Sequence, residues 1–420
     1  MAHDLTEIVY DEHLFSHLVD EAILFDRELR NGHSYPANFP GSMDVLTIPD
    51  VLGKEKMDVM LTSSTAWQSQ YSDIADVDEL KVPECGESFI TLMLTITDRY
   101  KCLPSPVHKL NFLKLQLELF EDFRIRLVQV MKEVIHNPLD NIFCAILNAV
   151  YYVTEVLTEW SDLLFFVQLQ YYNSKFSKDS SSDSIIHQTS IAHTDISQSL
   201  SELDDNDELS VHMEHGVFDS IIDLYDNLKK EMIKNIVNHI ATDVQSRSQP
   251  YRKERWISLP SQKDIVGQGL STSACEMLLV LKDHMSTVEN MLSKPLFIHI
   301  WQKLAEKLNK FIFDEVILQN RFNDGGAIQL QFDITRNLFP LFGEFTHKPE
   351  NYFRDVKEAC ILLNIKVGSA ILLKEELTAN LRLKDTKKSK TNLALHELGI
   401  FTLTPRQART VLSLRTDIPD

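Results

Sequence analysis

The chain has 420 residues, and its 61 Asp and Glu against 42 Lys and Arg give a formal net charge of −19. This charge repels an extended polyanion such as duplex nucleic acid, and the sequence offers only short basic clusters to oppose it. Hydrophobic residues make up 44% of the chain, which is enough to bury a core, and the length predicts two to four packed units. We therefore expect a folded protein that does not bind nucleic acid.

Helical spacing of apolar residues runs through most of the chain, and no strand pattern or fixed-period repeat accompanies it. Gly (12) and Pro (14) are scarce, which favours long uninterrupted elements. The spacing predicts helices, in chain order, at 5–30, 107–136, 139–175, 217–240, 270–292, 294–321, 327–345, 350–363 and 367–380. A last helix is predicted after Thr404, which suits the N-cap, with Pro405 at the first helical position and Gln407 completing a capping box.

Other segments are predicted to lie outside helices. Residues 31–53 are rich in Gly and Pro and predict a loop. Residues 176–213 are rich in Ser and Asp and predict a solvated linker, with a phosphorylated acidic tract as the alternative. Gly325-Gly326 lacks the spacing and the Lys-Ser/Thr of a phosphate-binding loop and predicts a turn.

The apolar stretch at 139–175 bears on the fold class. Its best candidate for a membrane span, residues 142–167, is interrupted by Asn148, Glu155, Glu159 and Asp162, so no span is predicted. A helix apolar on so much of its surface requires neighbours on several sides, and a helical bundle is the simplest arrangement. The acidic N-terminus lacks the apolar region of a secretory signal.

Candidate chemical sites are weak. His13 with His17, and His212 with His215, have helical spacing, but no third metal ligand is implied. The cysteines are far apart and predict reduced, mostly buried thiols of a cytosolic protein: Cys85, Cys102, Cys144, Cys275 and Cys360. We expect no catalytic residues, no metal and no cofactor.

Two basic stretches have functional alternatives. Residues 251–256, YRKERW, mix basic and aromatic side chains, which favours an anchor between bundles over RNA binding. The second stretch predicts a solvated loop, with contact to anionic lipid as the alternative; its basic residues are Arg382, Lys384, Lys387, Lys388 and Lys390.

Long blocks of this sequence resemble the RINT/TIP family of vesicle-tethering proteins. They include VDEAILFDRELR (19–30), YRKERWISLPSQ (251–262), FNDGGAIQLQFDITRNLFPLF (322–342) and LHELGIFTLTPRQARTVLSLRT (395–416), in order along nearly the whole chain. The resemblance implies an all-α fold of successive helical bundles stacked into a rod, as in multisubunit tethering complexes. It also implies a non-catalytic subunit of an NRZ- or Dsl-type complex, which acts in Golgi-to-ER retrograde transport, peripheral on the endoplasmic reticulum.

The partners implied by this resemblance are ZW-ten-type and NAG-type subunits and SNARE proteins of the endoplasmic reticulum. The family's chain begins before this one with a part that pairs with the ZW-type subunit, so we expect that pairing to be weakened. The alternative function is a nuclear adaptor in DNA-damage G2/M checkpoint control, which implies a nuclear pool.

We expect a middle bundle at 1–175, the linker at 176–213, a bundle at 214–345 and a C-terminal bundle at 346–420. Helical grooves would accept an amphipathic helix from a SNARE. The candidate partner-binding residues are Arg255, Trp256, Asn337, Tyr352 and Arg354.

Overall fold

The computed structural model describes residues 54–69, 81–103, 105–179, 216–261, 268–382 and 394–418. All regular elements in these ranges are helices, and their β pairing is limited to two isolated bridges, Ser69 with Pro83 and Phe322 with Arg415. The predicted all-α class is confirmed. The helix expected at 5–30, the loop at 31–53, both His pairs and most of the acidic linker lie outside the described residues.

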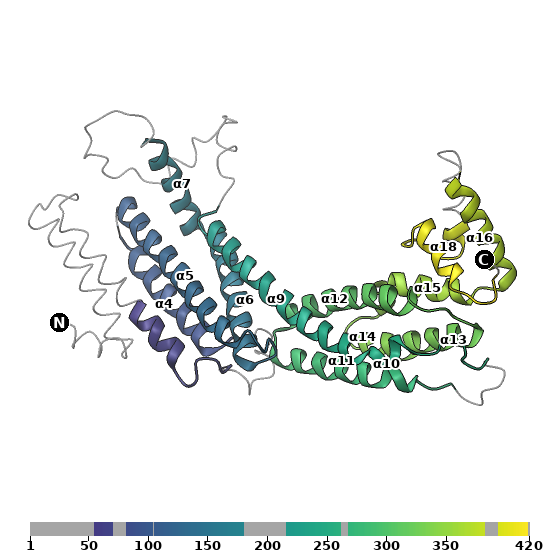
Figure 1. The fold of residues 1–420 in the computed structure, drawn as a ribbon. Coiled ribbons are helices and arrows are strands. Elements are labelled where there is room, and N and C mark those ends of the chain that lie inside the picture. The colour runs from purple at the N-terminus through teal and green to yellow at the C-terminus, as the bar shows by residue number, and fades with distance from the viewer. Residues whose placement is uncertain are drawn as a thin grey trace, which may run out of the picture. The chain divides into compact units, whose positions relative to one another are not determined.

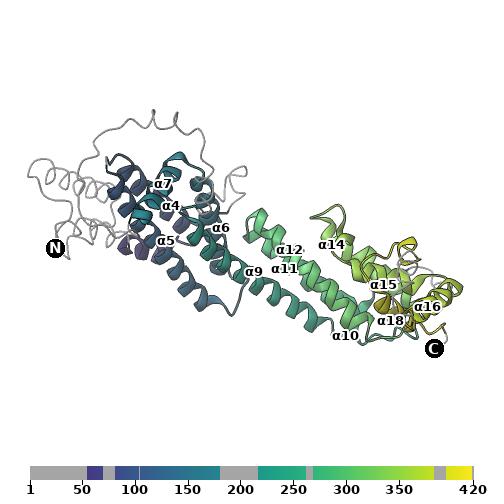
Figure 2. The ribbon, with the colours of Figure 1, turned by 90° about the horizontal axis from the view of Figure 1, so that it is seen from above.

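The chain divides into two compact units, Met1–Met232 (unit 1) and Ile233–Asp420 (unit 2), and the division falls within α9. The helices of unit 1 lie side by side in Figures 1 and 2. They are α4 (Glu84–Lys101), α5 (Pro106–Val134), α6 (Asn141–Ser161), α7 (Leu164–Asp179) and the first part of α9 (Asp219–Arg247), preceded by a short helix at 54–62. The predicted helix at 107–136 is thereby confirmed.

The single helix expected at 139–175 is two helices, so that prediction was wrong in its continuity. α6 begins after Asp140, whose side chain caps it by accepting a hydrogen bond from the Ile142 N–H at 2.9 Å. The chain breaks after α6 and resumes as α7, which lets Phe166 stack on Trp160 with ring centroids 5.7 Å apart. Both rings are buried, so aromatic packing accounts for a break that no Gly or Pro marks.

α6 is the central helix of unit 1. By length and composition alone it could cross a bilayer, but 61% of its most apolar window is buried inside the structure. It packs against α4, α5 and α7, and it buries Ile146, Val150 and Leu157 completely. Its apolar character is therefore accounted for by the bundle core.

The core of unit 1 joins aromatic packing to one closed polar network. Phe89 stacks on Phe123 with centroids 4.0 Å apart. Gln116, fully buried, accepts from the Tyr100 hydroxyl at 2.8 Å and donates to the Met93 carbonyl at 3.1 Å. Because its polar atoms have partners, the buried amide carries little of the usual desolvation cost and fixes how α4 and α5 pack.

Unit 2 contains the remaining helices (Figure 1). They are α10 (Gln249–Arg252), α11 (Thr272–Met291), α12 (Lys294–Phe311), η2 (Ile312–Ile317), α13 (Asp324–Asp333), η3 (Ile334–Leu338), α14 (Phe339–Gly343), η4 (Pro349–Asn351), α15 (Arg354–Asn364), α16 (Val367–Arg382) and α18 (Pro405–Ser413). The helices predicted at 270–292, 350–363 and 367–380 appear close to their expected bounds. Those at 294–321 and 327–345 also appear, but each contains a π-helical segment, η2 or η3, which apolar spacing does not predict.

The prediction of a turn at Gly325-Gly326 was wrong, because both glycines lie in the first turn of α13. Asn323 is the N-cap, and its Oδ1 accepts from the Gly326 N–H at 2.8 Å. A Cβ on Gly326 would lie 2.0 Å from the Trp256 carbonyl oxygen, and one on Gly325 would lie 2.3 Å from that of Pro260. Glycine is required here by the close approach of two backbones, not by a turn.

The C-terminal helix begins as predicted. Thr404 and Gln407 form a complete capping box, with Pro405 at the first helical position. Glu358 of α15 binds the segment before α18. Its buried carboxylate accepts hydrogen bonds from the backbone N–H groups of residues 401–403 at 2.8–3.0 Å. After α18, Arg415 donates to the carbonyls of Leu362 and Ile365 and pairs with Asp417.

Candidate partner-binding site

The segment that follows α10 is anchored by aromatic side chains. Trp256 is 1% exposed and packs edge-on against Tyr251, with centroids 5.1 Å apart, and against Phe322 at 5.6 Å. The sequence nominated Trp256 as a surface contact, but the structure places it in the core, where its ring packs against Tyr251 and Phe322. Arg255 beside it is exposed and is the member of this pair that a partner can reach.

Below this anchor, the buried Asp333 carboxylate joins four groups. It accepts from the Ser271 N–H at 3.0 Å, the Ser271 hydroxyl, the Tyr251 hydroxyl at 3.2 Å and the Gln329 amide at 2.9 Å. Burial raises the pKa of Asp333, and the hydrogen bonds from Ser271 oppose that rise. The carboxylate thus connects α10, the start of α11 and α13, and fixes the frame around the neighbouring pocket.

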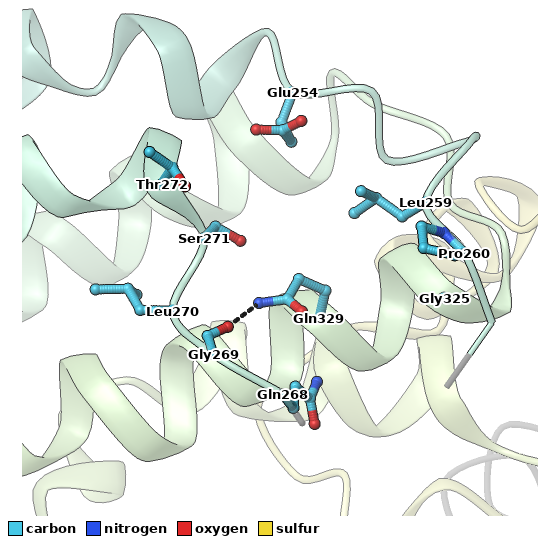
Figure 3. Close-up of a pocket in the computed structure, with 10 residues that line it drawn as sticks. All are labelled: Glu254, Leu259, Pro260, Gln268, Gly269, Leu270, Ser271, Thr272, Gly325 and Gln329. Carbon is cyan, nitrogen blue, oxygen red and sulfur yellow. Dashed lines mark hydrogen bonds between the residues drawn. The ribbon is translucent and has the colours of Figure 1, made fainter. Parts of the chain in front are cut away.

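An open pocket of about 410 Å³ lies between these elements (Figure 3). Its lining mixes polar and apolar residues: Glu254, Leu259, Pro260, Gln268, Gly269, Leu270, Ser271, Thr272, Gly325 and Gln329. The Gln329 amide crosses the pocket floor and donates to the Gly269 carbonyl at 2.9 Å. The carboxylate of Glu254 offers a hydrogen-bond acceptor to a ligand in this pocket.

The other three predicted residues occupy different surroundings. Tyr352 is half-buried. Its ring packs edge-on against Trp301, with centroids 4.8 Å apart, and its hydroxyl accepts a hydrogen bond from the Gln302 amide at 3.2 Å, so it has a packing role. Arg354 is exposed, and its Nε donates to the Asn351 carbonyl at 3.0 Å. Asn337 lies in η3, where its buried Nδ2 has no hydrogen-bond partner. Among the described residues, no hydrogen bond, ion pair or ring contact joins these three residues to Arg255.

A second depression lies along α11 and α14, with a volume of about 80 Å³. Its lining is largely apolar, with charges at the rim: Leu281, Lys282, Met285, Ser286, Glu289, Leu341, Phe342, Glu344 and Phe345. Leu341 and Phe345 are half-buried, so part of their apolar surface faces the depression. An apolar strip edged by charge is what the face of an amphipathic helix matches.

Cysteine and metal chemistry find no support in the described part of the chain. All five cysteines are free, and burial raises the pKa of Cys85, Cys144 and Cys360 to about 12, which keeps these thiols protonated. Cys102 is exposed and Cys275 is half-buried. No group of three His, Cys, Asp or Glu among those residues is placed to hold a metal ion.

Sequence reasoning missed the residues that shape this region. Asp333 and Glu358 each occupy a buried position on a helix. A carboxylate within a stripe of apolar residues was the sequence feature that could have identified them. Asn323 was noted only as part of a turn, yet it caps α13 and its Nδ2 donates to the Leu259 carbonyl at 2.8 Å. Each of the three has at least one partner more than forty residues away in the chain, which spacing alone does not reveal.

Known proteins share both the sequence and the fold. The model of the RINT-1/TIP-1 family matches residues 1–415. The RINT1-like protein of Drosophila melanogaster is 31% identical over 428 residues, covering 100% of this chain and 53% of the fly protein. The RINT1-like protein MAG2 of Arabidopsis thaliana is 22% identical over 313 residues, covering 71% of this chain and 36% of the plant protein. This chain therefore spans about half the length of the fly relative and about a third of the length of the plant relative.

Among solved structures, the Dsl1 complex subunit Tip20, in its crystal structure with the SNARE Sec20, has a similar fold. The TM-score is 0.57 at 15% identity, over 98% of this chain and 67% of that one. The predicted resemblance is confirmed by these comparisons: the chain belongs to the RINT-1/TIP-1 family.

Proposed function

We propose that this protein is a non-catalytic subunit of a vesicle-tethering complex that acts in Golgi-to-ER retrograde transport and binds SNARE proteins. The observation that carries the proposal is the family match over residues 1–415, and the Tip20-like fold supports it. Tip20 is described as a Dsl1 complex subunit bound to the SNARE Sec20. We extend that role to this chain and place it at the cytoplasmic face of the endoplasmic reticulum.

The helical architecture fits a scaffold role. SNARE N-terminal regions are helical, and the apolar depression along α11 and α14 offers half-buried Leu341 and Phe345 to the apolar face of such a helix. Lys282 and Glu344 at its rim would set the helix direction through charge. The exposed Arg255 beside the open pocket is the second candidate contact.

The test is calorimetric titration of the purified chain with the cytosolic regions of ER SNAREs. Saturable binding of one of them supports the proposal. Leu341→Lys should weaken that binding if the depression is used, and Arg255→Glu should weaken it if the open pocket is used. Leu279→Lys is the matched control, because Leu279 is 67% exposed on α11 and does not line the depression.

A folded chain that binds none of these SNAREs would contradict the SNARE part of the proposal. Localisation separates the tether from the checkpoint adaptor. The tether predicts steady association with the endoplasmic reticulum, whereas nuclear enrichment after DNA damage would favour the adaptor.

A further inference from the structure

The C-terminal segment reverses the charge of the rest of the chain. Residues 366–409 contain nine Lys and Arg against four Asp and Glu, a net charge of +5 in a chain of −19. α16 and α18 pack side by side (Figure 1), and Leu373, Leu377 and Val411 on these helices are buried. The segment is therefore basic in sequence within an acidic chain.

A pocket of about 430 Å³ opens beside the seam of these two helices. Five side chains line it, from both helices: Lys374, Arg406, Arg409, Thr410 and Ser413. Three of the five are cationic, and none is acidic or apolar. The volume is within the range of small-ligand sites, roughly 300–1,000 Å³.

Two of these cations lie on a well-packed helix, and no acidic side chain neutralises them among the described residues. Arg406 and Arg409 are exposed on α18, and neither side chain has an ion pair or hydrogen bond within the part of the chain that the structure describes. The buried residues Ala408 and Leu412 fix the helix that carries them. The exposed Glu375 and Glu376 are nearby in sequence on α16, but neither lines the pocket.

The two hydroxyl groups of the pocket donate their hydrogens within α18 and not to a ligand. Thr410 Oγ1 donates to the Arg406 carbonyl at 3.0 Å, and Ser413 Oγ donates to the Thr410 carbonyl at 2.6 Å. Their hydrogens are committed within α18, so binding depends chiefly on the guanidinium groups of Arg406 and Arg409. Guanidinium groups pair best with the planar or tetrahedral oxyanions of carboxylates and phosphates.

We propose that this pocket binds a compact ligand with several phosphate groups, of the kind presented by a polyphosphorylated inositol. Two exposed guanidinium groups within one turn of α18, with Lys374 lining the same pocket, favour a ligand with several charges in a small volume over a single carboxylate. The lack of apolar lining disfavours a phosphopeptide, whose flanking side chains and backbone would find no contact. The charge of −19 disfavours an extended nucleic acid. The site is independent of the proposed SNARE contact.

The test compares two sources of the same chemistry on the full chain. Calorimetry with soluble inositol hexakisphosphate measures the free ligand. Co-sedimentation with phosphatidylcholine vesicles containing phosphatidylinositol bisphosphate measures the membrane-bound headgroup, and vesicles with phosphatidylserine at equal charge control for simple surface attraction. Binding of the soluble compound identifies a free ligand, and selective binding of the inositol-lipid vesicles identifies a headgroup.

Variants then locate the site. The double variant Arg406→Gln/Arg409→Gln should lower affinity roughly thirtyfold, from the usual contribution of two basic residues near an anionic surface. Arg321→Gln/Arg336→Gln removes the same charge from other exposed positions of unit 2 and should leave affinity nearly unchanged. Helical circular dichroism of both variants should match the parent.

The proposal would be overturned by no binding in either arm, by equal losses in the two double variants, or by tighter binding of a phosphoserine peptide than of inositol hexakisphosphate. Equal binding to the phosphatidylserine vesicles would likewise show a diffuse surface effect and not a site.

Discussion

Replacement of Gly326 by Ala tests the closest backbone approach in the structure. Helix propensity alone predicts stabilisation, because Ala is favoured over Gly inside helices by about 1 kcal/mol. The structure predicts the opposite sign. The new Cβ would lie 2.0 Å from the Trp256 carbonyl oxygen, whereas ordinary contacts begin at 3.4 Å. A backbone oxygen cannot rotate away, so α13 and the Trp256 segment must separate.

The cost follows from what that separation disturbs. Overpacking a closed site costs typically about 1–3 kcal/mol. Moving α13 also strains the Asn323 contacts, which include the 2.8 Å bond to Leu259 and the 2.8 Å cap of Gly326 itself, at about 1 kcal/mol each. After the propensity gain is subtracted, the net loss is about 3 kcal/mol. For a unit of this size that corresponds to roughly 6–12 °C in Tm.

Thermal and urea unfolding, followed by far-ultraviolet circular dichroism and tryptophan fluorescence, measure the effect. Gly368→Ala is the matched control, since Gly368 is also near a helix start, in α16, and a Cβ there meets nothing within 4 Å. It should be neutral or stabilising by up to about 1 kcal/mol. Equal Tm changes in the two variants, or a Gly326→Ala protein as stable as the parent, would refute the steric reasoning.

Three further predictions concern neighbouring contacts. Glu358→Gln replaces a carboxylate that accepts four backbone hydrogen bonds and should destabilise the docking of α18 by about 2 kcal/mol, seen as faster hydrogen exchange there. The hydrogen bond from Arg415 lowers the pKa of Asp417 in the folded protein. Their pairing should therefore stabilise the folded state at pH values above the unfolded-state pKa of this carboxyl, and this stabilisation should be lost as pH falls through the lower folded-state pKa. Asp417→Asn should therefore reduce stability at pH 7 and make little difference at strongly acidic pH, in urea titrations at both. Trp256→Ala should cost about 3–5 kcal/mol, whereas Arg255→Ala should stay within about 0.5 kcal/mol, both by chemical denaturation.

Local rules predicted the elements well where one short segment decides the outcome. The capping box at Thr404 depends on four consecutive residues, and it forms as expected. The start of α6 at Asp140 is equally local. Spacing failed where distant packing decides, as in the break after α6, where the stacking of Phe166 on Trp160 overrides an unbroken apolar pattern.

The candidate site was predicted less well for the same reason. The sequence pointed to the segment around residues 251–256, and the structure shows it to be a well-anchored junction. The sequence did not show which side chains of this segment are buried, so the buried Trp256 and the exposed Arg255 were nominated together. The burial of Trp256 depends on contacts distant in sequence, such as that with Phe322, more than sixty residues later.

Two blocks that carry the family resemblance, 251–262 and 322–342, contact each other in unit 2. Trp256 packs against Phe322, Asn323 bonds to Leu259, and Gly326 lies against the Trp256 carbonyl. The likeness of these blocks to the family is therefore accounted for by mutual packing and is not by itself evidence of a binding surface. Partner contacts are better sought at exposed side chains outside this junction's core, where a change alters binding without altering the fold. Arg255 at its edge and Arg406 on α18 meet that condition, and Trp256 does not.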